Sequence, residues 1–171
     1  MIRKATHSDI ADIMSIVADA QLSLRELGID QWQDGYPSKA VIEEDIASEV
    51  GYVYTVDDKV VGYAAIVLNG EEAYSQISDH EWNTTSDYVV VHRLCVSRSY
   101  TNMGVAMTLM EHAQQMAKEY GYTGFRIDTH RGNIRMLAML VKLGFSYVGV
   151  IHYDSGERLA YDLKLSNRLK M

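Results

Sequence analysis

One stretch near the middle of the chain has the composition of a phosphate-binding turn. An apolar segment ending at Val96 leads into a polar run with a single glycine, Gly104, and then into a long amphipathic segment. The first backbone N–H groups of a helix have no partner within the helix, and the helix dipole places partial positive charge there. Such a turn can hold a diphosphate without basic side chains, and a glycine lets the backbone approach the ligand. The candidate phosphate-binding residues are Thr101, Asn102, Met103, Gly104, Val105 and Ala106.

Nucleophilic and metal chemistry have little support in the residue types. The chain has one cysteine, Cys95, so it has neither an internal disulfide nor a cysteine-based zinc site. In an apolar segment this thiol is expected to pack as a small hydrophobe. No Gly-x-Ser-x-Gly elbow offers a serine nucleophile. We therefore expect no metal site and no covalent enzyme intermediate.

Length and charge limit the organisation and the partners. With 171 residues, 47% of them hydrophobic, we expect a single domain over residues 1–171. A net charge of −7 without a long Lys/Arg run argues against nucleic-acid binding, although this acidity would suit a cationic acceptor. The apolar runs are far shorter than the roughly 20 residues of a membrane span, and the first residues lack a secretory signal. We expect a cytoplasmic protein that binds no membrane.

The phosphate-binding turn must be positioned by a strand before it and a helix after it, and the periodicity predicts both. Gly121 and Gly144 are predicted to end helices, and Asn133 to cap one. The elements predicted here are a strand at 88–96, a helix at about 106–120, a strand at 125–129, a helix at about 133–143, and strands at 146–153 and 157–165.

The first part of the chain supplies further strands and two helices. Thr6-x-x-Asp9 is typical of a capping box, and Ser38 is predicted to cap the second helix. The elements predicted here are a strand at 2–5, a helix to about residue 27, a helix at about 38–48, and strands at 51–56 and 60–68. The polar segment from Asn69 to Asp87 is long for a connection, so it is either a binding loop or a linker. The pattern indicates one mixed sheet with helices against its faces.

This order of elements and two local motifs resemble the GNAT superfamily of acetyl-CoA-dependent N-acetyltransferases over almost the whole chain. The family pattern L-x-V-x-P-x-x-[QR]-x-x-G-x-[GA] is matched by Leu94, Val96, Gly104 and Ala106. A second family pattern, N-x-x-A-x-x-x-Y-x-K-x-G-F, is matched by Asn133, Lys142, Gly144 and Phe145. The resemblance implies an α/β fold of mixed α and β elements. Its central, mostly antiparallel mixed sheet has about seven strands, with a splayed pair formed by the fourth and fifth, and about four helices flank it.

The resemblance also implies an activity and a cofactor. It implies transfer of the acetyl group of acetyl-CoA to a small-molecule or peptide amine by direct attack in a ternary complex. The main chain of Leu94, Cys95 and Val96 would pair with the pantetheine arm, with a backbone N–H near Val96 stabilising the oxyanion. Asn133 would contact the cofactor or only cap its helix, and Lys142 would meet the adenosine 3′-phosphate or only be solvated. Members often form homodimers, although the sequence identifies no interface.

Several positions depart from the family patterns. Arg98 stands where proline is frequent and Thr101 where Gln or Arg is usual, so the pyrophosphate would be held mainly by backbone N–H groups. Met136 replaces a small alanine. Leu140 occupies the position at which many members place a tyrosine that protonates the leaving thiolate, and leucine cannot donate a proton. Water, Tyr147 or Tyr153 could deliver it instead.

His92 is the candidate general base. Strand alternation would place His92, Leu94 and Val96 on one face, beside the reaction centre. An imidazole with a pKa near 6.5 can accept a proton from the attacking amine, directly or through water. The alternative is a packed or hydrogen-bonded histidine. Asp128 and His130 are rivals for the same role.

Aromatic residues in two loops could form a wall for the acceptor. Their alternative role is to anchor these loops to the core, and Asp128 could bind a cationic acceptor or merely cap a turn. The candidate acceptor-binding residues are Trp32, Tyr36, Trp82, Asp128 and His130.

Two other functions stay open at this point. A catalytically impaired acyl-CoA-binding module or sensor is favoured by Leu140 and Thr101. A noncatalytic interaction domain is favoured by the aromatic loops around Trp32 and Trp82. The sensor would bind the cofactor without turnover, and the interaction domain would not bind it.

Overall fold

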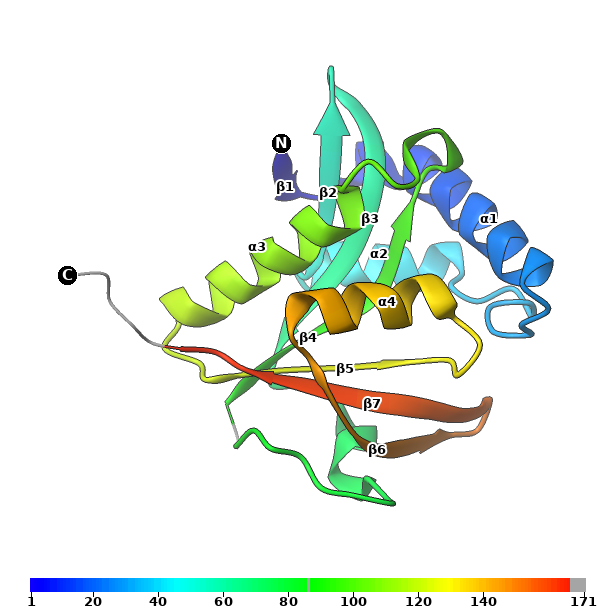
Figure 1. Cartoon of the computed structure of the whole chain (residues 1–171). Coiled ribbons are helices and arrows are strands. Elements are labelled where there is room, and N and C mark those ends of the chain that lie inside the picture. The colour runs from blue at the N-terminus through cyan, green and yellow to red at the C-terminus, as the bar shows by residue number, and fades with distance from the viewer. Residues whose placement is uncertain (86, 167–171) are drawn as a thin grey trace. The chain divides into compact units, whose positions relative to one another are not determined.

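The computed structural model describes residues 1–85 and 87–166 (Figure 1). Its strands are β1 (Ile2–Lys4), β2 (Gly51–Val56), β3 (Lys59–Leu68), β4 (Tyr88–Val96), β5 (Gly124–Thr129), β6 (Ser146–Tyr153) and β7 (Gly156–Lys164). Its α-helices are α1 (Ile10–Glu26), α2 (Lys39–Ala47), α3 (Val105–Glu119) and α4 (Ile134–Leu143). Short 3-10 helices are η1 (His7–Asp9), η2 (Glu72–Gln76) and η3 (Arg98–Tyr100).

The described strands form one seven-stranded sheet in the order β1-β2-β3-β4-β5-β7-β6. The pairs β1/β2, β2/β3, β5/β7 and β6/β7 are antiparallel, and β4/β5 is parallel. The ladder between β4 and β5 contains three residue pairs, Tyr88–Val90 with Gly124–Arg126, whereas β4 continues to Val96. The predicted mixed sheet with four flanking helices is therefore confirmed.

By its internal contacts the chain divides into two compact units. Unit 1 is Met1–Ile66 with Val91–His112, and unit 2 is Val67–Val90 with Ala113–Met171, described to residue 166. Strands β3 and β4 and helix α3 contribute residues to both units. The single domain over residues 1–171 stays a prediction.

In unit 1, the helices α1 and α2 bury their apolar faces against strands β2, β3 and β4. Its core residues are Ala5, Ile13, Ile16, Val17, Ile42, Val53, Val60, Tyr63 and Cys95. Gly62 allows the first turn of α3 to lie directly on β3, because a Cβ at Gly62 would come within 2.6 Å of Val105 Cγ1. The close approach fixes the start of α3, where the phosphate-binding turn is predicted.

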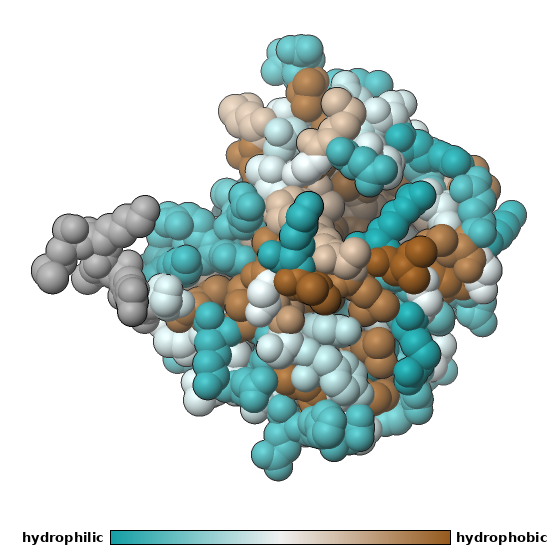
Figure 2. Space-filling model, in the orientation of Figure 1, coloured by the Kyte–Doolittle hydropathy of each residue, from teal (hydrophilic) through white to brown (hydrophobic). Residues whose placement is uncertain are grey.

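Unit 2 contains two groups of buried hydrophobic side chains. Phe125 of β5 and Phe145 meet edge to face at 4.9 Å next to α4, and Leu140 of α4 is fully buried. The other core contains Tyr74, Val90, Val148, Ile151 and Ala160. Hydrophobic side chains are also exposed over α4 (Figure 2), where Ile134 and Val141 are 63% and 70% exposed.

Several helix ends lie where the sequence predicts them, because nearby residues cap them. Ser38 Oγ accepts from the Val41 N–H at 3.3 Å, and Asn133 Oδ1 accepts from the Met136 N–H at 3.3 Å. Gly144 ends α4 with φ +89°, a left-handed conformation that glycine adopts without strain. The 3-10 helices η2 and η3 were not expected from the periodicity, because single turns carry too few residues to show one. Within residues 1–85 and 87–166, each helix is too short or too polar to cross a lipid bilayer.

Candidate active site

The predicted phosphate-binding turn lies in unit 1, between η3 and α3. Asn102 and Gly104 both have left-handed backbones, with φ +63° and +82°. Among the described residues, the backbone N–H groups of 102–104 have no hydrogen-bond acceptor in the protein. A Cβ built at Gly104 meets no atom within 4 Å, so the space that a side chain at this position would enter is open. The turn thus presents free backbone donors at the positive end of a 15-residue helix, as an anion site requires.

Contacts with α1 occupy the side chain of Arg98. Its Nη2 atom lies 3.2 and 3.3 Å from the two carboxylate oxygens of Glu26. Its backbone N–H donates to Asp19 Oδ2 at 3.0 Å. The side chain at the position where the family often has proline therefore holds the turn against α1. This arrangement is consistent with the expected reliance on backbone N–H groups.

Strand β4 is kinked at Arg93. The prediction that regular alternation places His92, Leu94 and Val96 on one face is therefore wrong. Arg93 has φ +56°, which interrupts the extended conformation between His92 and Leu94. All three of these residues are half-buried instead of alternating, and alternation resumes from Leu94 through buried Cys95 to Val96. A single left-handed residue re-aims the side chains that follow it. Simple alternation therefore does not relate His92 to Leu94.

His92 is held in its neutral form by its surroundings. Burial, together with the adjacent Arg93 charge, lowers the pKa of His92 to about 4. An imidazole with this pKa is unprotonated at neutral pH and can accept a proton, but it is a weaker base than one with a pKa near 7. The role of His92 as base stays a prediction.

This lowered pKa makes the stability of the protein depend on pH. Between pH 6.5 and pH 4 the unfolded chain protonates His92 and the folded chain does not, so the stabilisation present above pH 6.5 is lost as the pH falls. We expect the free energy of unfolding of the wild type to fall by about 2 kcal/mol more than that of His92→Gln between pH 7 and pH 4.5. Urea titrations at the two pH values measure this difference. Parallel losses in both proteins would contradict the assigned pKa direction.

Cys95 is a packed core residue. Its side chain is 4% exposed within the unit 1 core. Burial raises the pKa of its thiol to about 12, so the thiolate is nearly absent at neutral pH. The expectation that this cysteine packs as a small hydrophobe is confirmed.

The predicted acceptor residues of unit 1 lie in the loop between α1 and α2. Trp32 and Tyr36 meet edge to face with ring centroids 6.4 Å apart. Trp32 packs against the unit 1 core, whereas Tyr36 is 39% exposed. The Tyr36 carbonyl accepts from Gln21 Nε2 at 3.0 Å, and its hydroxyl accepts from Arg93 Nη1 at 3.0 Å. The loop therefore presents one anchored indole and one partly accessible phenol.

In unit 2, Asp128 receives two phenol hydrogen bonds. The hydroxyls of Tyr74 and Tyr153 donate to Asp128 Oδ2 at 2.7 and 2.8 Å. Burial raises the pKa of Asp128 although these hydrogen bonds oppose the shift. Nearby, His130 Nδ1 accepts from the Gly132 N–H at 2.9 Å, which orders the turn after β5. Asp128 and His130 keep their structural alternatives, and their part in binding or catalysis is not decided.

Trp82 has a well-defined anchoring role in unit 2. Its indole N–H donates to the Tyr74 carbonyl at 2.8 Å, and its ring lies 4.9 Å from the Tyr74 ring. The guanidinium carbon of Arg126 lies 4.5 Å from the Trp82 ring centroid and 4.1 Å from that of Tyr88. These contacts give Trp82 the role of fastening the 69–87 loop. Contact with an acceptor stays a prediction.

The second family motif covers α4, from Asn133 before the helix to Gly144 and Phe145 after it. Asn133 caps the helix, as one of its two predicted roles requires, and Lys142 is exposed on it. Leu140 is 0% exposed, so its side chain serves the core. Of the substitute proton donors, Tyr147 donates to Asp79 Oδ2 at 2.7 Å, and that hydrogen bond raises the pKa of its phenol. Burial raises the pKa of Tyr153. Both phenols are thus weaker acids than a free tyrosine.

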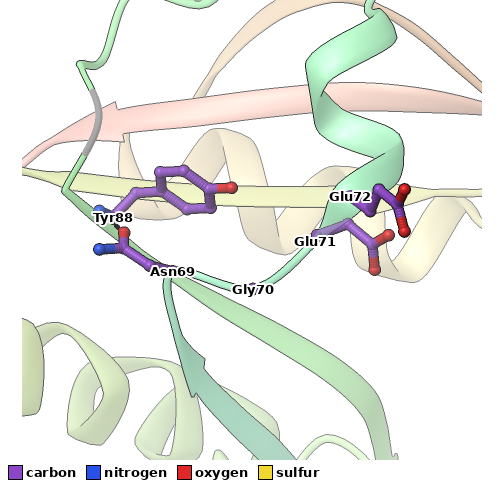
Figure 3. Close-up of a pocket in the computed structure, with 5 residues that line it drawn as sticks. All are labelled: Asn69, Gly70, Glu71, Glu72 and Tyr88. Atoms are coloured by element: carbon purple, nitrogen blue, oxygen red, sulfur yellow. Dashed lines mark hydrogen bonds between the residues drawn. The ribbon is translucent and has the colours of Figure 1, made fainter.

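A shallow hollow of about 490 Å³ opens at the start of the 69–87 loop (Figure 3). Asn69 and Tyr88 lie on one side of Gly70, and Glu71 and Glu72 lie on the other. Asn69 Oδ1 accepts from the Tyr88 N–H at 3.0 Å, which closes the base of the loop. None of the predicted site residues lines this hollow.

Sequence reasoning missed a buried ion pair beside the kink. Arg93 of β4 and Asp45 of α2 form two hydrogen bonds of 2.8 and 2.6 Å, although 48 positions separate them. A charged residue within the apolar run VVVHRLCV was the available signal, because such a residue is rarely buried without a partner. The identity of the partner could not be read from the sequence.

Comparison with known proteins gives a consistent result. The model of the acetyltransferase (GNAT) family matches residues 20–145. The chain is similar to a GNAT-family acetyltransferase of Streptococcus agalactiae 2603, with 34% identity, 97% and 95% of the two chains covered, and a TM-score of 0.87. It has the fold of a GNAT-family acetyltransferase from Listeria monocytogenes 4b F2365, with 20% identity, 96% and 94% coverage and a TM-score of 0.72.

A third structure was solved with a ligand. The PaiA N-acetyltransferase of Thermoplasma acidophilum, in complex with coenzyme A, shares the fold with 19% identity, 96% and 98% coverage and a TM-score of 0.70. A search of curated proteins found no match.

Proposed function

Because the chain belongs to the acetyltransferase (GNAT) family and is an acetyl-CoA-dependent acyltransferase, we propose that it acetylates an amine by direct attack in a ternary complex. The acceptor is a small molecule or a peptide. A cytoplasmic location and pairing into homodimers are further parts of this proposal, and they rest on the sequence and the family resemblance alone.

One observation carries the proposal: the turn before α3 offers backbone donors that no described protein atom uses. The N–H groups of residues 102–104 are free, and a Cβ built at the left-handed Gly104 would meet no atom within 4 Å. The pyrophosphate of acetyl-CoA would bind at Thr101–Ala106, where the dipole of α3 favours its negative charge. The turn therefore fits the cofactor that the family uses.

The rest of the cofactor site follows from strand β4. Its main chain from Leu94 to Val96 would pair with the amide groups of the pantetheine arm, as an added strand pairs with a sheet edge. A backbone N–H near Val96 would stabilise the oxyanion of the tetrahedral intermediate. Contacts of Asn133 and Lys142 with the cofactor remain separate predictions.

Direct attack is supported by the state of the single thiol. With a pKa of about 12 and 4% exposure, Cys95 is not available as an acyl-carrying nucleophile. The amine would attack the thioester carbonyl while His92, neutral at physiological pH, or a water molecule accepts its proton. The sulfur of coenzyme A would leave as a thiolate, a tolerable leaving group because thiols have pKa values near 8.5. Tyr36 and Trp32 would contact the acceptor.

Two measurements test the proposal in sequence. Acetyl-CoA at 100 times its dissociation constant should raise the free energy of unfolding by about 2.7 kcal/mol, which thermal unfolding detects. Initial rates with a panel of peptides, polyamines, amino sugars and antibiotics should give intersecting double-reciprocal lines. Parallel lines would indicate a covalent intermediate and overturn direct attack. Stabilisation without turnover of any amine would support the sensor instead.

A further inference from the structure

The backbone of β4 is strained at one residue, next to the main chain proposed to hold the cofactor. Among the residues of β4, Arg93 alone has a positive φ, +56°. A non-glycine residue adopts this conformation only when surrounding interactions maintain it, and such positions are concentrated at functional sites. The residue after the kink is Leu94, where pairing with pantetheine would begin.

An ion pair fixes the side chain of the strained residue. Arg93 Nε donates to Asp45 Oδ2 at 2.8 Å and Nη2 donates to Asp45 Oδ1 at 2.6 Å, so the contact is bidentate. The Tyr63 hydroxyl donates to Asp45 Oδ2 at 2.5 Å from β3. The side chains of Arg93 and Asp45 are 16% and 6% exposed. A bidentate, largely buried pair of this kind fixes the orientation of both partners.

The same guanidinium also reaches the loop between α1 and α2. Arg93 Nη1 donates to the Tyr36 hydroxyl at 3.0 Å, using a donor that the Asp45 pair leaves free. The planar arrangement of donors in arginine allows both contacts at once, whereas lysine would supply a single point charge. One side chain therefore connects α2, the strained point of β4 and the loop that carries the predicted acceptor residues.

We propose that Arg93 and Asp45 are positioning residues whose ion pair maintains the left-handed kink in β4 and so presents the main chain of Leu94–Val96 to acetyl-CoA. This inference rests on the proposed function, because the ligand whose binding it controls is the cofactor. Without the kink the strand would be extended through residue 93, and its groups beyond that point would turn to the opposite face. Only the kinked form would bind acetyl-CoA, so any loss of its population weakens the apparent affinity by the same factor.

A matched pair of double variants separates positioning from packing. Asp45→Asn with Arg93→Gly and Asp45→Asn with Arg93→Ala both lack the ion pair and leave no unpaired carboxylate in the core. They differ only in how readily residue 93 adopts a positive φ, which glycine does freely and alanine does not. Without the pair to hold the kink, we expect the glycine variant to bind acetyl-CoA with a dissociation constant about tenfold lower than that of the alanine variant. Isothermal titration calorimetry with acetyl-CoA measures both.

The outcomes distinguish this inference from the proposed function. No heat of binding from the wild type would refute the cofactor site itself. Binding by the wild type, with dissociation constants of the two double variants within twofold of each other, would refute the positioning role. Thermal unfolding is recorded in parallel, because a purely structural residue would change the melting temperatures and leave the two constants equal.

Tyr36→Phe tests the connection to the loop without touching the Asp45 pair. It removes the hydroxyl that Arg93 Nη1 contacts, on a side chain that is 39% exposed. With the best amine of the panel, we expect the KM of the acceptor to rise three- to tenfold when Tyr36→Phe is made in the wild type and less than twofold when it is made in the Asp45→Asn, Arg93→Ala variant, where the guanidinium is already absent. Loss of a direct contact between the Tyr36 hydroxyl and the acceptor would raise this KM equally in both backgrounds. The calorimetric dissociation constant of acetyl-CoA should stay within twofold of the wild-type value. An unchanged acceptor KM would remove the loop from the inference.

Discussion

Gly104→Val should weaken the binding of acetyl-CoA by about 100-fold or more. Gly104 has φ +82°, a conformation in which a β-branched side chain is severely strained. Valine must either shift the turn or add its methyl groups to the space at residue 104 that glycine leaves open, next to the free N–H groups of residues 102–104. Both results separate the pyrophosphate from its donors, and a 100-fold loss corresponds to about 2.7 kcal/mol.

Gly121→Val is the matched control for this substitution. Gly121 has φ +77°, and a Cβ built there also meets no atom within 4 Å, but it follows the C-terminal end of α3. Both variants carry similar backbone strain and should lose similar stability in urea titrations, whereas only Gly104→Val should lose affinity in calorimetry with acetyl-CoA. A dissociation constant within threefold of the wild type for Gly104→Val would show that the turn does not hold the cofactor.

The sequence predicted this turn because every signal it needs is local. The glycine, the preceding apolar strand at 88–96 and the following helical periodicity all lie within about 30 residues. Helix ends were predictable for the same reason, since Ser38 and Asn133 cap helices through the backbone three residues on. Such contacts depend on spacing along the chain and hardly on the rest of the fold.

Contacts between distant segments could not be predicted in the same way. Nothing near His92 in the sequence shows that Arg93 is bound by Asp45 of α2, and this pair accompanies the kink that breaks the expected alternation. The pairing of Asp128 with Tyr74 joins residues 54 positions apart. The lowered pKa of His92 was beyond reach of the sequence for a related reason, because its main cause is burial, which depends on how the whole unit packs.

Asp162→Ala should lower the free energy of unfolding by about 3–5 kcal/mol, because it removes the only carboxylate from a buried network in which Asp162, Thr84 and Arg126 fasten the 69–87 loop. Asp162 is 2% exposed, and its Oδ2 accepts from the backbone N–H groups of Asn83 and Thr84 at 2.6 and 2.9 Å. It also accepts from Thr84 Oγ1 at 3.1 Å, and Thr84 Oγ1 in turn accepts from Arg126 Nε at 2.8 Å. Alanine leaves these donors without an acceptor, and each buried orphan costs about 1–3 kcal/mol.

Asp162→Asn gives the comparison that identifies the cause. Its amide oxygen can still accept from the Thr84 N–H, so we expect roughly half the loss of the alanine variant in the same urea titration. Equal stability of Asp162→Ala and the wild type would mean that the loop is not held by this carboxylate.

The same variants address the two roles of Trp82. If Trp82 only anchors the loop, releasing Thr84 and Arg126 lowers stability and leaves the acceptor KM of the folded enzyme unchanged. If it also contacts the acceptor, the KM of the best amine rises in Asp162→Ala and recovers in Asp162→Asn in step with stability. Since Trp82 already uses its N–H on Tyr74 and its face on Arg126, anchoring alone accounts for its position, and an unchanged KM is the expected result.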